Sequence, residues 1–214
     1  MNDLNPLRIR IFFSKNEAMR FTGHLDLHKT WERIFRRAGL PLAYSQGFHP
    51  QPRLNLGCAL PLGFTSQAEI LDAWLENPLP LPDVQAELTR AAPPGINITH
   101  IDVVDLKEPA LQTQISSSEY IITFLTPVPD LDQKISSILS AESIPRQRRE
   151  RNYDLKLLVE ELHRLPENLV GKACILTRLA ARTGATGRPE ELILTMGLDP
   201  NLTRVHRSRL IFRE

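Results

Sequence analysis

The sequence is poor in cysteine, with only Cys58 and Cys174 in 214 residues. Both lie in apolar, strand-like runs, which favours buried reduced thiols over a disulfide framework. An iron–sulfur cluster normally takes several cysteine thiolates, so two cysteines exclude a cluster held by this chain alone. Cys58 also has Leu56, Ala59 and Leu60 around it, and an apolar setting disfavours the thiolate that a nucleophile needs.

Long hydrophobic runs are missing as well. No stretch approaches the roughly 20 apolar residues that cross a bilayer, and the first ten residues, MNDLNPLRIR, have no signal-peptide core. We therefore expect a cytoplasmic protein with no membrane partner. With 42% hydrophobic and 24% charged residues, the composition is that of an ordinary globular protein of one large or two small domains.

The formal net charge of +1 hides an uneven distribution along the chain. Residues 1–60 contain nine Lys and Arg against four Asp and Glu, whereas residues 61–110 contain two against eight. One interpretation is that these charges decorate solvated faces. The other is a basic surface formed by the N-terminal part together with later arginine clusters.

Hydrophobic periodicity predicts the elements of the first half of the chain. Alternation predicts strands over 7–13, 54–62 and 69–75 and over 96–104, with Asp72 and Trp74 facing outward, and residues 18–21 resume the first strand. The helical spacing of Leu27, Trp31, Ile34, Phe35 and Ala38 predicts one helix, ended by Gly39, and a second helix is predicted over 83–91. The order β-α-β-β-α-β is that of the ferredoxin-like motif.

After a polar linker at Ser116–Ser118, the pattern partly restarts. It predicts strands over 120–124, 172–182 and 204–213, a helix over 129–141 that buries Leu131, Ile135, Ile138 and Leu139, and a short helix opened by Pro189. Residues 144–158 carry several arginines and then an extended run, NYDLKLLV. We therefore predict an α+β protein of two ferredoxin-like halves, residues 1–110 and 117–214, the second irregular with an extra extended segment.

The stretch from Arg20 to Leu62 has the densest chemistry. A basic helix carries Arg33, Arg36 and Arg37 away from its apolar face. The loop that follows, YSQGFHPQPR, holds many hydrogen-bonding groups between rigid prolines.

This stretch also carries a family resemblance. The runs GHLDL, RRAGLPLAYSQGFHPQPRL and ALPLG, with NYDLKLLV, TGRPEELI and RVHRSRL further on, resemble a bacterial family known as radical SAM-linked proteins. Members occur as separate chains or fused after radical SAM proteins with a cobalamin-binding region, so the resemblance implies such a protein as partner. The chain lacks the closely spaced three-cysteine motif of a radical SAM enzyme, and no cofactor of its own is indicated.

Two histidines open the basic helix. His24 and His28 are four residues apart, a spacing that can place two imidazoles on one metal. No HEXXH pattern and no third ligand accompany them, which favours a structural or capping role. The helix N-terminus near Thr22 and Gly23, with Arg20 close by, could hold an anion.

The loop itself has two interpretations. It could be a surface loop held together by its own side chains. Alternatively Tyr44, His49 and Arg53 converge on a ligand, with Arg53 contacting a phosphate or carboxylate and Phe48 or Tyr44 offering a stacking face. For Arg53 the competing interpretation is an ion pair with Glu69 or Asp72.

Two later segments each have two interpretations. The glycine-containing segment 184–189 precedes a helix and could receive phosphate through Arg188, but it lacks the Walker lysine pattern, which favours a plain turn. Residues 146–151 form an arginine run that is either a solvated loop or a nucleic-acid contact.

The preferred hypothesis is a non-catalytic accessory module that binds RNA, such as tRNA or rRNA, or another polyanion, and works with a radical SAM protein. The predicted ligand-binding residues are Arg20, His24, Arg33, Arg36, Arg37, Tyr44, Phe48, His49, Arg53 and Arg188. One alternative is a metal-independent endoribonuclease that uses His49 or His24 with Tyr44. The other is a protein adaptor that docks on a radical SAM subunit and touches no RNA.

Overall fold

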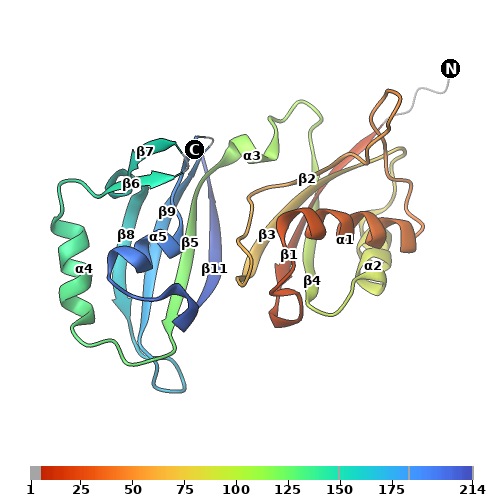
Figure 1. Ribbon diagram of the computed structural model, residues 1–214. Helices are drawn as coiled ribbons and strands as arrows, with labels where there is room; N and C mark the ends of the chain where they lie inside the picture. The colour runs from red at the N-terminus through yellow and green to blue at the C-terminus, as the bar shows by residue number, and fades with distance from the viewer. Residues whose placement is uncertain (1–5, 149, 183, 214) are drawn as a thin grey trace. The chain divides into compact units, whose positions relative to one another are not determined.

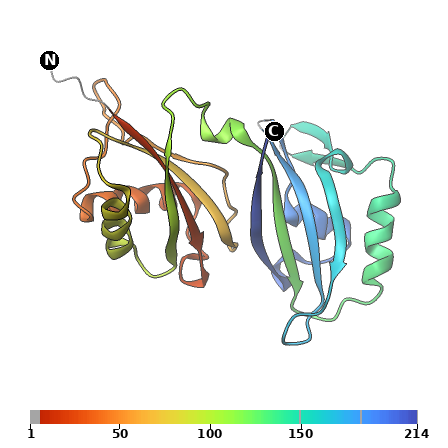
Figure 2. The same ribbon diagram turned by 180° about the vertical axis from the view of Figure 1, so that it is seen from behind.

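The computed structural model describes residues 6–148, 150–182 and 184–213, with the side chain of Arg151 left aside. The chain is α+β, as the sequence predicts, and divides into two compact units. Unit 1 is residues 1–114 and unit 2 is residues 115–214. Within each unit the main strands pair antiparallel (Figures 1 and 2).

Unit 1 contains a sheet in which β2, β3, β1 and β4 are neighbours in that order. Strand β1 pairs antiparallel with both β3 and β4, so it lies in the centre of the sheet. The chain runs through β1 (Leu7–Lys15), the 3-10 helix η1 (Glu17–Met19), α1 (His24–Arg37), β2 (Leu54–Leu56), β3 (Thr65–Leu75), α2 (Leu81–Ala91), β4 (Ile96–Val104) and α3 (Leu111–Gln114).

Helix α1 forms where the apolar spacing predicts it. Gly23 is its N-cap, and Gly39 follows it in the left-handed conformation at φ 66°. The buried face consists of Leu27, Trp31, Ile34 and Phe35. These side chains join residues of β1, β3 and α2 in one hydrophobic core, which leaves the basic face of α1 to solvent.

Two side chains of β3 expected to face solvent are buried. Asp72 is 0% exposed and Trp74 is 8% exposed. The reason lies in the arginines of β1, because Arg8 and Arg10 both pair with the Asp72 carboxylate at 2.6 and 2.8 Å. Arg8 also donates to the backbone oxygens of Glu108 and Pro109, so the segment after β4 covers this face of the sheet.

Unit 2 has the strand order β8, β9, β5 and β11, again antiparallel throughout. A separate hairpin is formed by β6 and β7. Helix α5 lies in front of the strands in Figure 1 and behind them in Figure 2, and so covers one face. The elements are β5 (Ile115–Phe124), α4 (Leu131–Ser140), β6 (Pro145–Arg148), β7 (Arg151–Asp154), η2 (Lys156–Leu158), β8 (Val159–Leu165), β9 (Cys174–Arg182), β10 (Ala185–Thr186), α5 (Pro189–Thr195), η3 (Pro200–Leu202) and β11 (Thr203–Phe212).

Several sequence expectations in unit 2 were wrong. The polar Ser116–Ser118 segment is part of β5, because Ser117 donates to Glu160 and Ser116 to the backbone oxygen of Ile211, which satisfies both hydroxyls inside the sheet. Leu139 of α4 is 48% exposed instead of buried. Strand β8 was missed, since it follows directly on the extended run that the sequence left undivided.

Unit 1 differs from expectation in two short segments. Residues 17–19 form the 3-10 helix η1 and do not resume β1, which instead extends to Lys15. Strand β2 ends at Leu56, where the sequence predicts a strand to Leu62. Beyond it Gly57 donates to the backbone oxygen of Ile70, and the chain then turns through 57–63.

Candidate polyanion-binding surfaces

Four cations form a stripe on the exposed side of α1. Lys29, Arg33, Arg36 and Arg37 are spaced at helical intervals and all are exposed. We call this set the α1 stripe. Among the described residues, none of the four makes an ion pair with a carboxylate, whereas Arg90 on α2 is paired with Glu87. The stripe is therefore positive charge that the fold leaves uncompensated.

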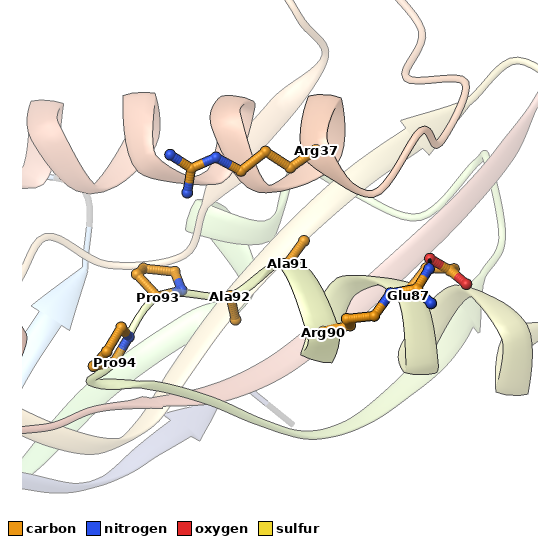
Figure 3. A pocket seen from close by; sticks show the side chains of 7 residues that line it. All are labelled: Arg37, Glu87, Arg90, Ala91, Ala92, Pro93 and Pro94. Atoms are coloured by element: carbon orange, nitrogen blue, oxygen red, sulfur yellow. Dashed lines mark hydrogen bonds and ion pairs between the residues drawn. The ribbon is translucent and has the colours of Figure 1, made fainter.

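Two adjoining hollows lie beside the α1 stripe. One, of about 500 Å³, is lined by Phe21, Lys29, Arg33 and Arg37 among others. The other, of about 490 Å³, lies where α1 and α2 approach, and Figure 3 shows Arg37 above the prolines that follow α2. Arg37 and Pro93 line both hollows, so the cations border one continuous depression.

Arg20, at the start of this region, has a structural role. Its guanidinium donates to the backbone oxygen of Gly63 at 2.8 Å and lies 3.6 Å from Glu17. It also stacks over the Phe21 ring at 4.9 Å. These contacts fix the segment that leads into α1. They also give the Arg20 guanidinium protein partners, although the sequence predicted that it binds a ligand.

The two histidines of α1 lie in different settings. His24 is the first residue of the helix and is exposed. His28 has Glu32 at 2.9 Å from Nδ1 and the backbone oxygen of Leu54 at 3.3 Å from Nε2. Because both ring nitrogens of His28 already have partners, it joins α1 to β2, which favours the structural reading over a shared metal.

The loop after α1 is a short ladder with an exposed tip. Tyr44 pairs with Pro52, and the Ser45 amide donates to the backbone oxygen of Gln51 at 2.8 Å. Tyr44 is 52% exposed, Phe48 is 102% exposed and His49 is exposed. Within the described chain, no side-chain hydrogen bond or ring contact joins these three to one another or to Arg53. The loop presents separate aromatic groups to solvent and does not form a closed pocket.

Arg53 stacks on an aromatic ring. Its guanidinium lies 4.8 Å from the centroid of Trp74, and Arg8 lies 5.1 Å from the same ring. The expected alternative of an ion pair with Asp72 is wrong, since Arg8 and Arg10 occupy that carboxylate. A guanidinium oriented by a ring face keeps its N–H donors at the edge, where a phosphate can accept them.

Unit 2 contains a groove of about 1250 Å³ that we call the unit 2 groove. It is bordered by the β6–β7 hairpin, by η2 and by the turn between β9 and β10. Its described lining residues are Arg148, Glu150, Asn152, Tyr153, Asp154, Leu157, Leu158, Arg182, Gly184, Ala185, Thr186, Arg188 and Arg213. The structure thus brings together the arginine run and the 184–189 segment, which the sequence presents as unrelated.

The acidic groups near this groove are partly committed elsewhere. A hydrogen bond from the Ile144 amide lowers the pKa of Asp154, whose Oδ1 also accepts from the Lys156 amide. Burial raises the pKa of Tyr153, and Glu191 acts in the same direction. The phenol is therefore neutral at physiological pH.

Glu190 is a half-buried residue beside the groove cations. Its Oε2 has no hydrogen-bond partner among the described residues. Burial raises its pKa above the ordinary 4.5, against the opposing influence of Arg188 and Arg148. The folded protein therefore holds this proton more tightly than the unfolded chain does.

This raised pKa predicts a pH-dependent effect of Glu190→Gln. Below pH 4.5 the carboxyl is protonated in both states, so the variant and the parent should melt at similar temperatures. As pH rises from 4.5 through the raised folded pKa, the parent loses stability that the neutral amide retains. In thermal melts, the melting temperature of the variant relative to that of the parent should be higher at pH 7 than at pH 4. The same difference in melting temperature at both pH values would contradict a raised pKa of Glu190 in the folded protein.

The unit 2 groove is the feature that sequence reasoning missed. From the sequence, Arg188 was predicted to bind a ligand, and residues 146–151 were treated as an unrelated segment. The pairing of β9 with β10, which brings Arg182 near both, has no local sequence signature. Arg213 arrives from the end of β11. Of the original run, Arg149 and the side chain of Arg151 lie outside the described part of the chain.

Comparison with solved structures identifies the class of fold. The chain is similar to the crystal structure of a Cbf5–Nop10–Gar1 complex, with a TM-score of 0.50 and 13% identity, over 94% of this chain and 48% of that one. It also matches a structure of an H/ACA RNP bound to a substrate RNA containing 2'-deoxyuridine, with a TM-score of 0.38 and 13% identity, over 88% and 43% of the two chains. The chain spans about half the length of these structures or less, and the first likeness shows a shared α+β fold.

The chain belongs to a bacterial family described as an uncharacterized protein conserved in bacteria, DUF2344, which it matches over residues 8–189. That span covers most of both units. No curated protein matches the chain. In the described residues no helix is long and apolar enough to cross a membrane.

Proposed function

We propose that this protein is an RNA-binding accessory module whose contact surface on unit 1 is the α1 stripe. The observation that carries the proposal is the set of four exposed cations without carboxylate partners in the described structure. Each phosphate that such a cation neutralises releases counterions from the nucleic acid, which favours binding at low salt. The exposed Tyr44 and Phe48 rings and the stacked Arg53 supply further contacts from the loop.

The stripe is costly to the protein unless it has a ligand. Arg33 and Arg37 are four residues apart on one helix, where like charges destabilise by about 0.2–0.5 kcal/mol per pair. Asp26 and Glu32 lie on the same helix, but Glu32 pairs with His28 and, in the described structure, neither carboxylate makes an ion pair with the four cations, whereas on α2 Arg90 pairs with Glu87. A row of cations without ion-pair partners, beside a depression, is suited to binding the phosphates of a nucleic-acid backbone.

The experiment is filter binding of tRNA and rRNA fragments to the triple variant Arg33→Ala, Arg36→Ala, Arg37→Ala. Affinity should fall by at least about tenfold, since each charge-assisted hydrogen bond contributes roughly 1.5–3 kcal/mol in favourable cases. The melting temperature should stay equal or rise, because like-charge repulsion is relieved and alanine favours helix.

Lys107→Ala is the matched control, since Lys107 is exposed on unit 1 but lies outside α1. It should change affinity less than about twofold. Failure of the parent protein to bind any RNA at micromolar concentration would remove the proposal. If a radical SAM protein then co-purified with the chain after nuclease treatment, a protein adaptor would replace it.

We also infer that each unit is a ferredoxin-like half and that the module works with a radical SAM partner. The observed strand orders β2-β3-β1-β4 and β8-β9-β5-β11, each with two helices between strands, support the first point. The resemblance of the HPQPR loop region supports the second. No specific contact favours catalysis by His49, because its ring makes no hydrogen bond or ion pair with a described residue.

A further inference from the structure

We infer that the unit 2 groove is a separate binding site for a single-stranded polynucleotide. It lies on a different unit from the α1 stripe and does not depend on the function proposed for that stripe. Three features of the groove support this inference: its size, the convergence of its arginines and the apolar surface between them.

The size indicates an extended ligand. At about 1250 Å³ the groove exceeds the range of roughly 300–1,000 Å³ that is usual for small-molecule pockets. It is bordered by a hairpin, a 3-10 helix and a tight turn, all within unit 2. A chain of several nucleotides fills such a groove better than one metabolite does.

The charge indicates a polyanion. Arg148, Arg182, Arg188 and Arg213 line the groove from four separate segments. Arg148, Arg188 and Arg213 make no ion pair within the described residues, whereas Arg182 pairs with Glu160 at 3.8 Å. Glu150 and Asp154 also line the groove, so its arginines outnumber its carboxylates, and phosphates bound there would offset the repulsion among the arginines.

The apolar surface favours a single strand over a duplex. Tyr153, Leu157 and Leu158 also line the groove, and Leu157 is 74% exposed. Exposed bases can stack on an aromatic ring and rest against aliphatic side chains, whereas a duplex presents its phosphates and hides its base faces. Cations mixed with an aromatic and apolar strip are the combination that single-stranded nucleic acid uses.

A close backbone approach fixes the segment that carries Arg188. A Cβ on Gly187 would lie 3.0 Å from the Leu179 Cβ and 3.3 Å from the Leu158 backbone oxygen. The Gly187 amide also donates to the backbone oxygen of Ala180 at 2.8 Å. These contacts hold the segment carrying Arg188 against η2, so the cation and the apolar strip keep a set spacing without a ligand.

The test measures binding of a fluorescent oligouridine of about ten nucleotides, a length within the usual range of single-strand sites, to the full chain. The variant Arg148→Ala, Arg188→Ala, Arg213→Ala should bind it at least about tenfold more weakly. Arg164→Ala, an exposed arginine of unit 2 outside the groove, should leave binding within about twofold.

A second pair of variants tests the stacking face. Tyr153→Ala should weaken binding about tenfold and Tyr153→Phe should not, because the ring and not the hydroxyl contacts the base. Unfolding curves show whether either change disturbs the fold. If Tyr153→Ala binds like the parent, the single-strand assignment is overturned.

Competition identifies the ligand class. A matched RNA duplex or a base-free polyphosphate should compete much less well than unlabelled oligouridine, and equal competition by either would overturn the proposal. The triple variant of the α1 stripe should retain oligouridine binding at the unit 2 groove. If it loses that binding while the groove variant keeps it, the inference fails and the α1 proposal stands.

Discussion

Replacing Asp72 with Asn should destabilise unit 1 by about 3–5 kcal/mol, the usual cost of leaving a buried charge without its partner. The Asp72 carboxylate is fully buried and accepts bonds from both Arg8 and Arg10. Arg8 is only 2% exposed, so without the carboxylate its guanidinium cannot recover water. The amide of the variant would also turn an N–H toward one of the two donors.

Tryptophan fluorescence during urea unfolding measures this effect on unit 1. Both tryptophans, Trp31 and Trp74, belong to that unit. The matched control is Asp132→Asn, which breaks an exposed ion pair with Arg164 in unit 2 and should cost less than about 1 kcal/mol in a melt of the whole chain. A cost below about 1 kcal/mol for Asp72→Asn would mean that the pair contributes no more than a surface contact.

Gly95→Ala should destabilise unit 1 by about 2–5 kcal/mol, for two reasons that add. The residue has a φ of 94°, which alanine adopts at a cost of roughly 1–2 kcal/mol. Its Cβ would also lie 2.9 Å from the Met19 backbone nitrogen and 2.7 Å from the Met19 side chain. Overpacking of this kind costs about another 1–3 kcal/mol.

Gly39→Ala separates the two contributions. Gly39 has a φ of 66°, but a Cβ there would meet nothing within 4 Å. Only the backbone cost of about 1–2 kcal/mol should remain. In urea unfolding, the free energy of unfolding should be clearly lower for Gly95→Ala than for Gly39→Ala. Equal values would contradict the close approach of η1 to the turn after α2.

Local sequence signals predicted the secondary structure where a single apolar face decides it. The spacing of Leu27, Trp31, Ile34 and Phe35 and the position of Gly39 predicted α1 almost to the residue. Asp72 could not be placed correctly, because its burial depends on arginines of β1 that are more than sixty residues away. A carboxylate that alternates with leucines reads as solvent-facing until its partners are known.

Part of the candidate site could likewise be predicted from local sequence, and part depends on tertiary contacts. The basic face of α1 follows from helical spacing, so Arg33, Arg36 and Arg37 were predicted. For the loop, convergence of Tyr44 and His49 was one of two interpretations. The ladder between Tyr44 and Pro52 leaves the tip exposed, and whether these residues bind a ligand stays a prediction. The unit 2 groove depends on tertiary contacts between segments, which periodicity cannot reveal.

The salt dependence of RNA binding tests the central claim most directly. The logarithm of the association constant should fall linearly with the logarithm of salt concentration for the parent protein. In the variant Arg33→Ala, Arg36→Ala, Arg37→Ala the slope should be shallower by about 2–3, since each lost phosphate contact removes roughly 0.7–0.9. Identical slopes for parent and variant would show that the α1 stripe does not contact phosphate.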